Sequence, residues 1–305
     1  MNMKYIFIIN PTSGTAMCNE IEETLKKLRE TQNLEYETRY TTRGSDATRF
    51  AAEYSVEDDV TIVACGGDGT VYEVINGIRP GVRMAIIPTG TGNDFYRMID
   101  PKKDVIKLIE ETINGQVIDV DYGVCNGRPF MNCTTMGIDA IVNEYVCESL
   151  KKPIMPKDFM YAVAAVKSIF NPKPFMAEIT IDDQKITKEV LLVAVMNGRY
   201  YGNGVSPTIN ADITDGLFDI CIVKKVGIPL LVTLLPVYFA GKGHLLGRYI
   251  TFIRGKNIKV SSNIDITFQS DGESYHGKNL DITIKNKALP LQVPCHSPLL
   301  NSSRA

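Results

Sequence analysis

Continuous apolar runs alternate with helical periodicity through roughly the first third of the chain. The runs typical of buried strands are Tyr5–Ile9, Val60–Cys65 and Arg83–Pro88, and a further strand is expected over Tyr36–Thr41. Apolar residues at helical spacing predict helices over Cys18–Thr31, after the Ser45–Asp46 pair, which can cap a helix, and over Val71–Gly77. Repeated strand–loop–helix units of this kind predict an α/β domain with a parallel sheet.

After about Gly115 the pattern changes to short strands separated by turn residues. One helical stretch, Asp139–Phe170, interrupts them, with a break at Pro153–Pro156. The series favours an antiparallel sheet or sandwich. The expected strands are Val117–Val124, Pro129–Thr134, Ala177–Asp182, Lys188–Met196, Phe218–Val223, Asn257–Val260, Asp265–Gln269 and Leu280–Ile284.

Composition narrows the class of protein. The chain has 305 residues, of which 44% are hydrophobic and 22% charged, so it can bury a sizeable core and its length favours two domains. Its 33 Lys and Arg nearly balance its 35 Asp and Glu, so no nucleic-acid partner is expected. Seven cysteines without a C-x-x-C pair indicate reduced thiols. The histidines, His244, His276 and His296, are expected in loops and in no metal-ligand cluster.

No segment predicts export or membrane crossing. The first ten residues hold only a five-residue apolar run, which is too short for the core of a signal peptide. The longest apolar stretch, Val226–Ala240, is broken by Gly227, Pro229 and Pro236, whereas a spanning helix needs about 20 apolar residues. We therefore expect a cytoplasmic protein that at most rests on a membrane surface.

Three loops rich in small residues follow predicted strands. They are Asn10–Gly14, Gly66–Thr70 and Pro88–Phe95. The carboxyl ends of neighbouring parallel strands face one crevice, where ligands bind. Glycines let the backbone approach a phosphate, and a helix N-terminus offers N–H donors. The loops therefore predict a phosphate-rich ligand, and Asp68 among them implies Mg²⁺ or a ligand hydroxyl.

These motifs resemble, in order and spacing, the diacylglycerol kinase catalytic family, and in particular its soluble bacterial lipid kinases related to sphingosine kinases. The resemblance spans Lys4–Ile284. One departure is Tyr72, where the family often has Asn. The matching motifs are Asn10-Pro11-x-Ser13-Gly14, Thr41 with Asp46-Ala47, Gly66–Thr70 with Glu73 and Asn76, Gly90–Phe95, Asp215–Asp219 and Asp271-Gly272-Glu273.

The resemblance implies a kinase with ATP bound between two domains. The α/β domain would cover residues 1–120, completed by residues 285–298, and an antiparallel β-sandwich over residues 121–284 would take the lipid. The implied nucleotide contacts are Asn10, Pro11, Thr12, Ser13, Gly14, Thr41, Gly66, Gly67, Asp68, Gly69, Thr70, Glu73 and Thr91.

Carboxylates near the C-terminal motifs supply the remaining chemistry. A lipid hydroxyl needs a carboxylate to accept its proton, and the resemblance implies that one of the pair Asp271 and Glu273 is this base. Glu273 is the first choice and Asp271 the second; a plain Asp-Gly hairpin turn is the alternative. Similar proteins bind Mg²⁺ through the equivalent of Asp215 and through main-chain oxygens near Asp212 and Leu217, and an exposed acidic turn is the alternative here.

The segment from Ile220 to Asn263 contains no Asp or Glu but seven Lys or Arg, beside the apolar run Val226–Ala240. Such a combination predicts contact with anionic phospholipid, and the alternative is a sandwich core with a solvated basic rim. Edge strands of the second sheet are able to pair between chains, which leaves a homodimer open.

The sequence thus predicts an ATP- and Mg²⁺-dependent lipid kinase with diacylglycerol as the leading acceptor. A sphingoid base, a monoacylglycerol or phosphatidylglycerol are the other acceptors considered. NAD kinase shares the Gly-Gly-Asp-Gly-Thr loop but does not call for the Asn10–Gly14 and Gly90–Phe95 motifs. A regulator that binds nucleotide or lipid without catalysis is the remaining alternative.

Overall fold

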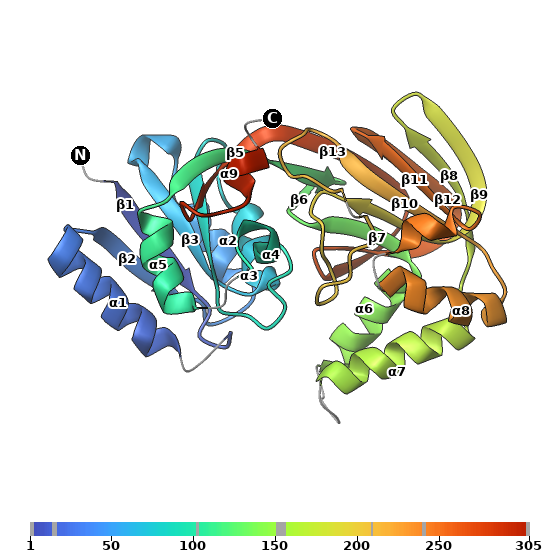
Figure 1. Cartoon of the computed structure of the whole chain (residues 1–305), viewed down its shortest axis with the longest axis horizontal. Coiled ribbons are helices and arrows are strands. Elements are labelled where there is room, and N and C mark those ends of the chain that lie inside the picture. Colours follow the sequence, from blue (N-terminus) through green and yellow to red (C-terminus); the bar gives the residue numbers. More distant parts are fainter. Residues whose placement is uncertain are drawn as a thin grey trace.

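The chain forms two parts that lie side by side (Figure 1). The computed structural model describes residues 3–13, 17–101, 104–150, 157–208, 210–239 and 242–302. Helices surround strands in the first part, whereas most of the second part is sheet, with helices along one edge (Figure 1).

Four strands of the first part pair in parallel in the order β4-β3-β1-β2. The inner three are buried along nearly their whole length, which explains their continuous apolar runs. The outer strand is half-buried. The strands are β1 (Lys4–Ile9), β2 (Glu35–Tyr40), β3 (Val60–Gly66) and β4 (Arg83–Pro88).

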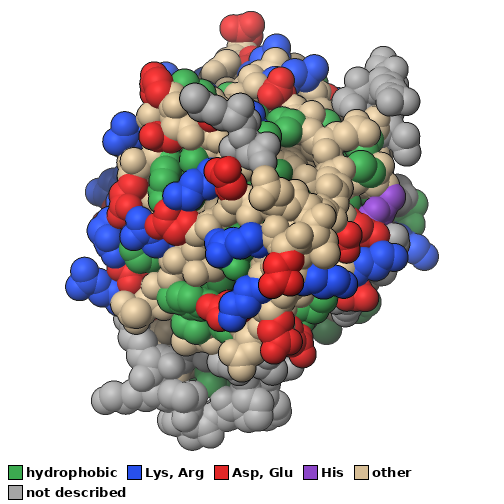
Figure 2. Space-filling view, turned by 90° about the vertical axis from the view of Figure 1, so that its left-hand side faces the viewer, with side chains coloured by type: hydrophobic (Ala, Val, Ile, Leu, Met, Phe, Trp, Pro, Cys, Tyr) green, Lys and Arg blue, Asp and Glu red, His purple; other side chains and the backbone are tan. Residues whose placement is uncertain are grey.

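Helices cover both faces of this parallel sheet. On one face, α1 (Met17–Gln32) and α5 (Val105–Ile113) bury apolar side chains against the strands. On the other face lie α2 (Asp46–Ala51), α3 (Asp68–Ile75) and α4 (Tyr96–Ile99). A short 3₁₀ turn, η1 (Val56–Asp58), precedes β3. On the face of the molecule in Figure 2, acidic and basic side chains are interspersed, without a single-sign patch.

The strands of the second part pair with one another in antiparallel fashion and bury one large apolar core. This core contains Phe130 stacked on Phe218. The strands are β5 (Gln116–Cys125), β6 (Arg128–Phe130), β7 (Cys133–Gly137), β8 (Phe175–Ile181), β9 (Gln184–Met196), β10 (Phe218–Lys224), β11 (Ile250–Gly255), β12 (Asn257–Ser270) and β13 (Glu273–Val293).

Helices α6 (Ile138–Leu150), α7 (Lys157–Phe170) and α8 (Ile228–Phe239) lie at the edge of the second part (Figure 1). The 3₁₀ turn η2 (Gly243–Leu246) follows α8, and α9 (Leu299–Ser302) ends the described chain. The predicted break at Pro153–Pro156 lies outside the described residues. None of the described helices is both long enough and apolar enough to cross a bilayer.

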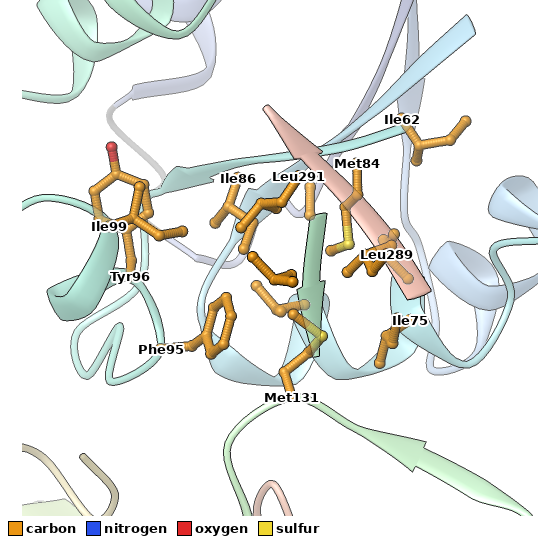
Figure 3. Close-up of a cluster of buried hydrophobic side chains, with 14 of the residues drawn as sticks. Ile62, Ile75, Met84, Ile86, Phe95, Tyr96, Ile99, Met131, Leu289 and Leu291 are labelled. Atoms are coloured by element: carbon orange, nitrogen blue, oxygen red, sulfur yellow. The ribbon is translucent and has the colours of Figure 1, made fainter. Parts of the chain in front are cut away.

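Strand β13 joins the two parts. It pairs with β12 and β5 in the second part, and Leu291 and Gln292 near its end pair in parallel with β4. Figure 3 shows Leu289 and Leu291 of β13 packed among core side chains of the first part, together with Met131 from the second. Because β5 and β13 run through both parts, the domain limits of 1–120 with 285–298, and 121–284, stay a prediction.

Several strand limits differ from the prediction. Asn257–Val260 and Asp265–Gln269 belong to the single strand β12, whose pairing shifts between Ser261 and Ile266. The expected strand over Pro129–Thr134 is divided between β6 and β7. Strand β11 was missed, because an exposed edge strand has little continuous apolar pattern.

Candidate active site

The loops that follow β1, β2, β3 and β4 meet at one edge of the parallel sheet. The N–H of Asn10 donates to the carbonyl of Cys65, that of Thr41 to Ile9, and that of Thr89 to Gly66. These contacts of 2.9–3.0 Å link the loops laterally. The predicted nucleotide-contacting residues of all four loops therefore lie at a common edge; among them, Gly14 lies outside the described residues.

The first loop is held by the Asn10 side chain. Its Oδ1 accepts from the N–H and the hydroxyl of Thr12, at 3.0 and 2.7 Å. Its Nδ2 lies 3.3 Å from Oγ1 of Thr70, at the start of α3. Asn10 thus fixes the loop after β1 to the helix after β3, and Thr12 stays exposed.

The glycines of the second and third loops permit close backbone contact. A Cβ on Gly66 would lie 2.1 Å from Oγ1 of Thr70, and a Cβ on Gly90 would lie 2.4 Å from Cα of Gly67. The backbones of the two loops therefore touch at Gly67 and Gly90, without room for a side chain at Gly90. Gly69 has no atom within 4 Å of an added Cβ, so open space adjoins the first turn of α3.

Two carboxylates, Asp68 and Asp94, lie close together beside these loops. Oδ1 of Asp68 accepts from the N–H of Phe95 at 3.3 Å. Asp94 is buried, and burial together with the charge of Asp68 raises its pKa. Its Oδ2 accepts from the N–H of Asn203 at 2.8 Å, whereas its Oδ1 lies 3.3 Å from Nε of Arg97 without a hydrogen bond. Asp94 belongs to the Gly90–Phe95 motif, but its sequence context alone predicted no role for it.

Glu73 joins helices α2 and α3. Its Oε2 accepts from the N–H of Ala47 at 3.1 Å, and its carbonyl accepts from the Thr48 hydroxyl at 2.8 Å. The predicted cap is also different, because Ser45 makes no side-chain cap and Asp46 instead accepts from the preceding Thr42. These bonds position the loop after β2, which includes Thr41.

In the second part, Asp271 and Gly272 form the two-residue turn between β12 and β13. Both have positive φ, 46° and 94°, as a tight hairpin turn of this type requires. The alternative interpretation as an Asp-Gly hairpin is therefore correct as a description of the backbone. It leaves the chemistry of the Asp271 side chain open.

The Asp271 carboxylate turns away from solvent onto the chain between β6 and β7. It accepts backbone N–H groups from Met131 at 2.5 Å and from Asn132 and Cys133, both at 2.9 Å. Burial nevertheless raises the pKa of Asp271 to about 7; the charge of Asp68 raises it further, and the three N–H bonds act in the opposite direction. Glu273 is exposed at the start of β13.

Side chains also bridge the two parts beside this turn. The hydroxyls of Tyr72 on α3 and Tyr275 on β13 are 2.8 Å apart. Nδ2 of Asn76 donates to the carbonyl of Pro129 at 3.0 Å. Tyr72, the departure from the family pattern, thus makes a contact that depends on Tyr275.

The predicted metal-binding loop forms two tight turns. Oδ1 of Asp212 accepts from the N–H of Thr214 at 2.9 Å, and Oδ1 of Asp215 accepts from the N–H of Leu217 at 3.0 Å. The guanidinium of Arg254 pairs with Asp215 and lies 3.4 Å from Asp219. The structure therefore balances the charge of Asp215 with Arg254, and the magnesium prediction for Asp212, Asp215 and Leu217 stays a prediction.

A buried carboxylate that the sequence analysis missed holds this loop in place. Asp121 on β5 accepts from the N–H groups of Gly216 and Lys287, each at 2.6 Å. Burial raises its pKa, and the charge of Asp215 acts in the same direction. No local signal marked Asp121, because both donors are far away in the sequence.

Comparison with known proteins identifies the family. A model of the diacylglycerol kinase catalytic domain matches residues 4–125, and a model of the YegS C-terminal NAD kinase beta sandwich-like domain matches residues 132–293. A diacylglycerol kinase of Staphylococcus saprophyticus is 31% identical over 91% of this chain and 91% of its own length. A diacylglycerol kinase of Bacillus subtilis is 29% identical over 87% and 88%.

The chain belongs to the diacylglycerol kinase family. It is an enzyme of the lipid kinase class, and the expected two-domain organisation is confirmed. The solved structure of a diacylglycerol kinase from Bacillus anthracis superimposes with a TM-score of 0.71 at 24% identity, over 96% of this chain and 98% of that one, and so shares its fold. In this kinase family member, the charge of Asp68 in the glycine loop acts on Asp271 in the turn between β12 and β13, which links the two parts electrostatically.

The contact between Gly67 and Gly90 gives a direct test of the loop arrangement. Gly90→Ala should weaken binding of a non-hydrolysable ATP analogue about ten- to hundredfold, because forcing an extra methyl into a packed site costs about 1–3 kcal/mol. Gly247→Ala is the matched control, since its Cβ would meet nothing within 4 Å. Titration calorimetry measures both. Equal affinity of Gly90→Ala and the native chain would show that the two loops do not shape the site.

Proposed function

We propose that this kinase transfers the γ-phosphate of ATP to the free hydroxyl of diacylglycerol. The names of its relatives support this acceptor. The single observation that carries the proposal is the position of Asp271, a buried carboxylate with a pKa near 7 that is electrostatically coupled to Asp68 in the glycine loop of the other part.

The nucleotide phosphates would lie over Gly67–Thr70, where open space adjoins Gly69 at the N-terminus of α3, the end of a helix that favours phosphate. The loop after β1, with Thr12 and Ser13, and the loop with Thr91 would flank them. A helix of eight residues also carries a partial positive charge at this end, which favours a phosphate.

Asp271 is a better candidate for the base than Glu273, which reverses the order preferred from the sequence. A general base works best when its pKa lies near the working pH, and burial brings the pKa of Asp271 to about 7. The base would accept the proton of the lipid hydroxyl as that oxygen attacks the γ-phosphorus and the bond to the ADP oxygen breaks. Phosphoryl transfer otherwise depends on positioning and charge stabilisation.

Mg²⁺ would be held by Asp68 and Asp94 together with the ATP phosphates. Oδ1 of Asp94 is buried beside the charge of Asp68 and makes no hydrogen bond among the described residues, which supports this assignment; Nε of Arg97, 3.3 Å away, would have to move aside for the ion. Carboxylate oxygens are ligands that Mg²⁺ accepts, and the bound ion would neutralise phosphate charge. The Asp212–Leu217 loop would take a second ion only if Arg254 releases Asp215.

The reaction is tested by phosphate transfer from radiolabelled ATP to diacylglycerol in mixed micelles, with and without Mg²⁺. In the native chain, kcat/KM should rise with pH through about 7, because the base must lose its proton. Asp271→Asn should lower kcat at least about a hundredfold, as loss of a general base does. Glu273→Gln is the matched control and should keep both activity and the pH profile.

Each other outcome changes a defined part of the proposal. If only Glu273→Gln loses activity, Glu273 and not Asp271 is the general base. Transfer only to a sphingoid base, a monoacylglycerol or phosphatidylglycerol keeps the kinase and changes the acceptor. Nucleotide binding without transfer to any lipid in a total extract favours the regulator that has lost catalysis. Thermal unfolding of each variant separates loss of catalysis from loss of fold.

We further propose that α7, α8 and η2 rest on an anionic phospholipid surface, where the lipid substrate is found. Helices α7 and α8 lie together at one edge of the second part (Figure 1), and Phe170, Val232 and Leu245 are exposed there. Of the seven basic residues in this segment, Lys225, Arg254 and Lys259 pair with carboxylates. Lys224, Lys242 and Arg248 supply the attraction to the surface. A homodimer through edge strands of the second sheet stays a prediction.

Sedimentation with vesicles that contain phosphatidylglycerol tests this surface. Replacing Lys224 and Lys242 by Glu should weaken partitioning about thirtyfold or more, since each Lys near an anionic surface contributes about 1 kcal/mol. Replacing Lys26 and Lys27 on α1 by Glu makes the same charge change on the other part and should leave binding unchanged. Equal losses in both double variants would indicate a response to net charge, which contradicts the proposed surface.

A further inference from the structure

Helix α6 packs against the hairpin whose turn carries Asp271. On this helix, Nδ2 of Asn143 donates to the carbonyl of Gly272 at 2.6 Å and to the hydroxyl oxygen of Ser274 at 2.9 Å. On the other side of the turn, the N–H of Gly272 donates to Oε1 of Gln269 at 2.7 Å. Side chains therefore hold both backbone polar groups of Gly272, which fixes the conformation of the turn.

The support from Gln269 comes from the sheet. Gln269 is buried, and its Nε2 donates to the hydroxyl oxygen of Thr135 on β7 at 3.0 Å. Strand β7 begins at Cys133, one of the residues whose N–H groups donate to the Asp271 carboxylate. Gln269 thus joins the turn to the strand that receives the carboxylate, and Asn143 supplies the support from the helix.

Helix α6 is held in place on both sides of Asn143. Near the start of the helix, Asp139 accepts from the hydroxyl of Tyr201. Directly after Asn143, Oε1 of Glu144 lies 2.6 Å from Nε2 of His276 on β13. The expectation that His276 lies in a loop is therefore wrong. Because other bonds fix the helix, the amide of Asn143 is presented to the turn from a firm support.

Asn143 is an unfavourable residue for the interior of a helix. The Asn side chain competes with the backbone for hydrogen bonds, and Ala or Leu stabilises a helix better. A residue that departs from the local preference is expected where a contact with another element compensates for it. For Asn143 that contact is with the turn beside the Asp271 carboxylate.

We propose that Asn143 is a positioning residue for phosphate transfer, which fixes the turn so that the Asp271 carboxylate stays on the backbone N–H groups of Met131–Cys133. This inference rests on the proposed role of Asp271 as the base. Without the Asn143 amide, the Gly272 carbonyl would need water as its partner, and the turn would gain conformational freedom. The carboxylate would then lie less often where it can accept the proton of the lipid hydroxyl.

Hydrogen exchange in the full chain tests the positioning without any measurement of activity. In Asn143→Ala, the amides of Met131–Cys133 should exchange about tenfold faster than in the native chain, as expected for the loss of one hydrogen bond. Ala favours a helix, so α6 is retained. Asn126→Ala is the matched control, because Nδ2 of Asn126 also donates to a carbonyl of β13, that of Asn279, at 3.1 Å. In the control, the Asp281 amide should exchange faster instead, since it donates to Oδ1 of Asn126 at 2.8 Å.

Kinetics of the same variants test the consequence for transfer. Asn143→Ala should lower kcat about tenfold at unchanged KM for ATP and diacylglycerol, because the loss affects the transition state and not the bound substrates. The rise of kcat/KM should move to lower pH, since exposure to water removes the effect of burial that raises the pKa of Asp271. Titratable groups near Asp271 include Asp68, Tyr72, Cys133 and Glu273, and a substitution of one neutral side chain by another changes none of them. The control should keep kcat and the pH profile.

Faster exchange together with lower kcat in Asn143→Ala, and not in Asn126→Ala, supports the proposal. Equal changes in both variants would indicate a general loosening of β13 and would overturn it. Unchanged exchange or unchanged kcat in Asn143→Ala, with Asp271→Asn inactive, would overturn the role of Asn143 alone. Full activity in Asp271→Asn would overturn the proposed base, and with it this role in transfer.

Discussion

The hydrogen bonding of β13 to both parts of the molecule is the constraint on which the rest of the structure depends. The turn that precedes this strand directs the Asp271 side chain inward. Near the other end of the strand, Leu291 and Gln292 extend the parallel sheet beside β4. The buried Gln292 amide donates to the Tyr5 hydroxyl and to the carbonyls of Thr112 and Ile113, which fastens this end. A shift of β13 along its length would therefore move Asp271 relative to the glycine loops.

This arrangement holds the buried carboxylates of Asp94 and Asp271 within electrostatic reach of Asp68. Burial raises the pKa of both Asp94 and Asp271, and the charge of Asp68 raises each further. For Asp271 the folded chain binds a proton more tightly than the unfolded chain, whose ordinary pKa is 3.8. Its stabilising contribution is therefore complete below pH 3.8 and is lost as the pH rises through about 7. Repulsion among the charges of Asp68, Asp94 and Asp271 would also favour the binding of a cation beside them and the transfer of a proton from the substrate to Asp271.

The parts of the site that follow from local sequence were predictable. The Gly66–Thr70 and Gly90–Phe95 segments lie at the ends of buried strands, and each contains glycines at positions where a side chain would not fit. Strands β1, β3 and β4 were also predictable, because a continuous apolar run indicates a strand that is buried on both faces. The family resemblance rested on these local motifs and is confirmed.

Features that depend on distant contacts were not predictable. Asp271 and Glu273 are two residues apart, and only the N–H groups of Met131–Cys133, about 140 residues away, distinguish them. Asp94 accepts a hydrogen bond from the N–H of Asn203. Lys225 of the basic segment forms an ion pair with Glu189, so its charge is not available to a membrane surface. His296 has acidic partners on α4 and α5, which no spacing rule could bring to it. In each case burial or pairing comes from another element.

The pKa of Asp271, followed by carboxyl-carbon NMR in isotopically labelled protein, tests the central claim most directly. The signal is assigned from its absence in Asp271→Asn. The structure predicts a pKa of about 7 that falls in Asp68→Asn, because the charge of Asp68 contributes to the increase across the boundary between the two parts. A pKa near the ordinary 3.8, or one that does not respond to Asp68→Asn, would contradict the account.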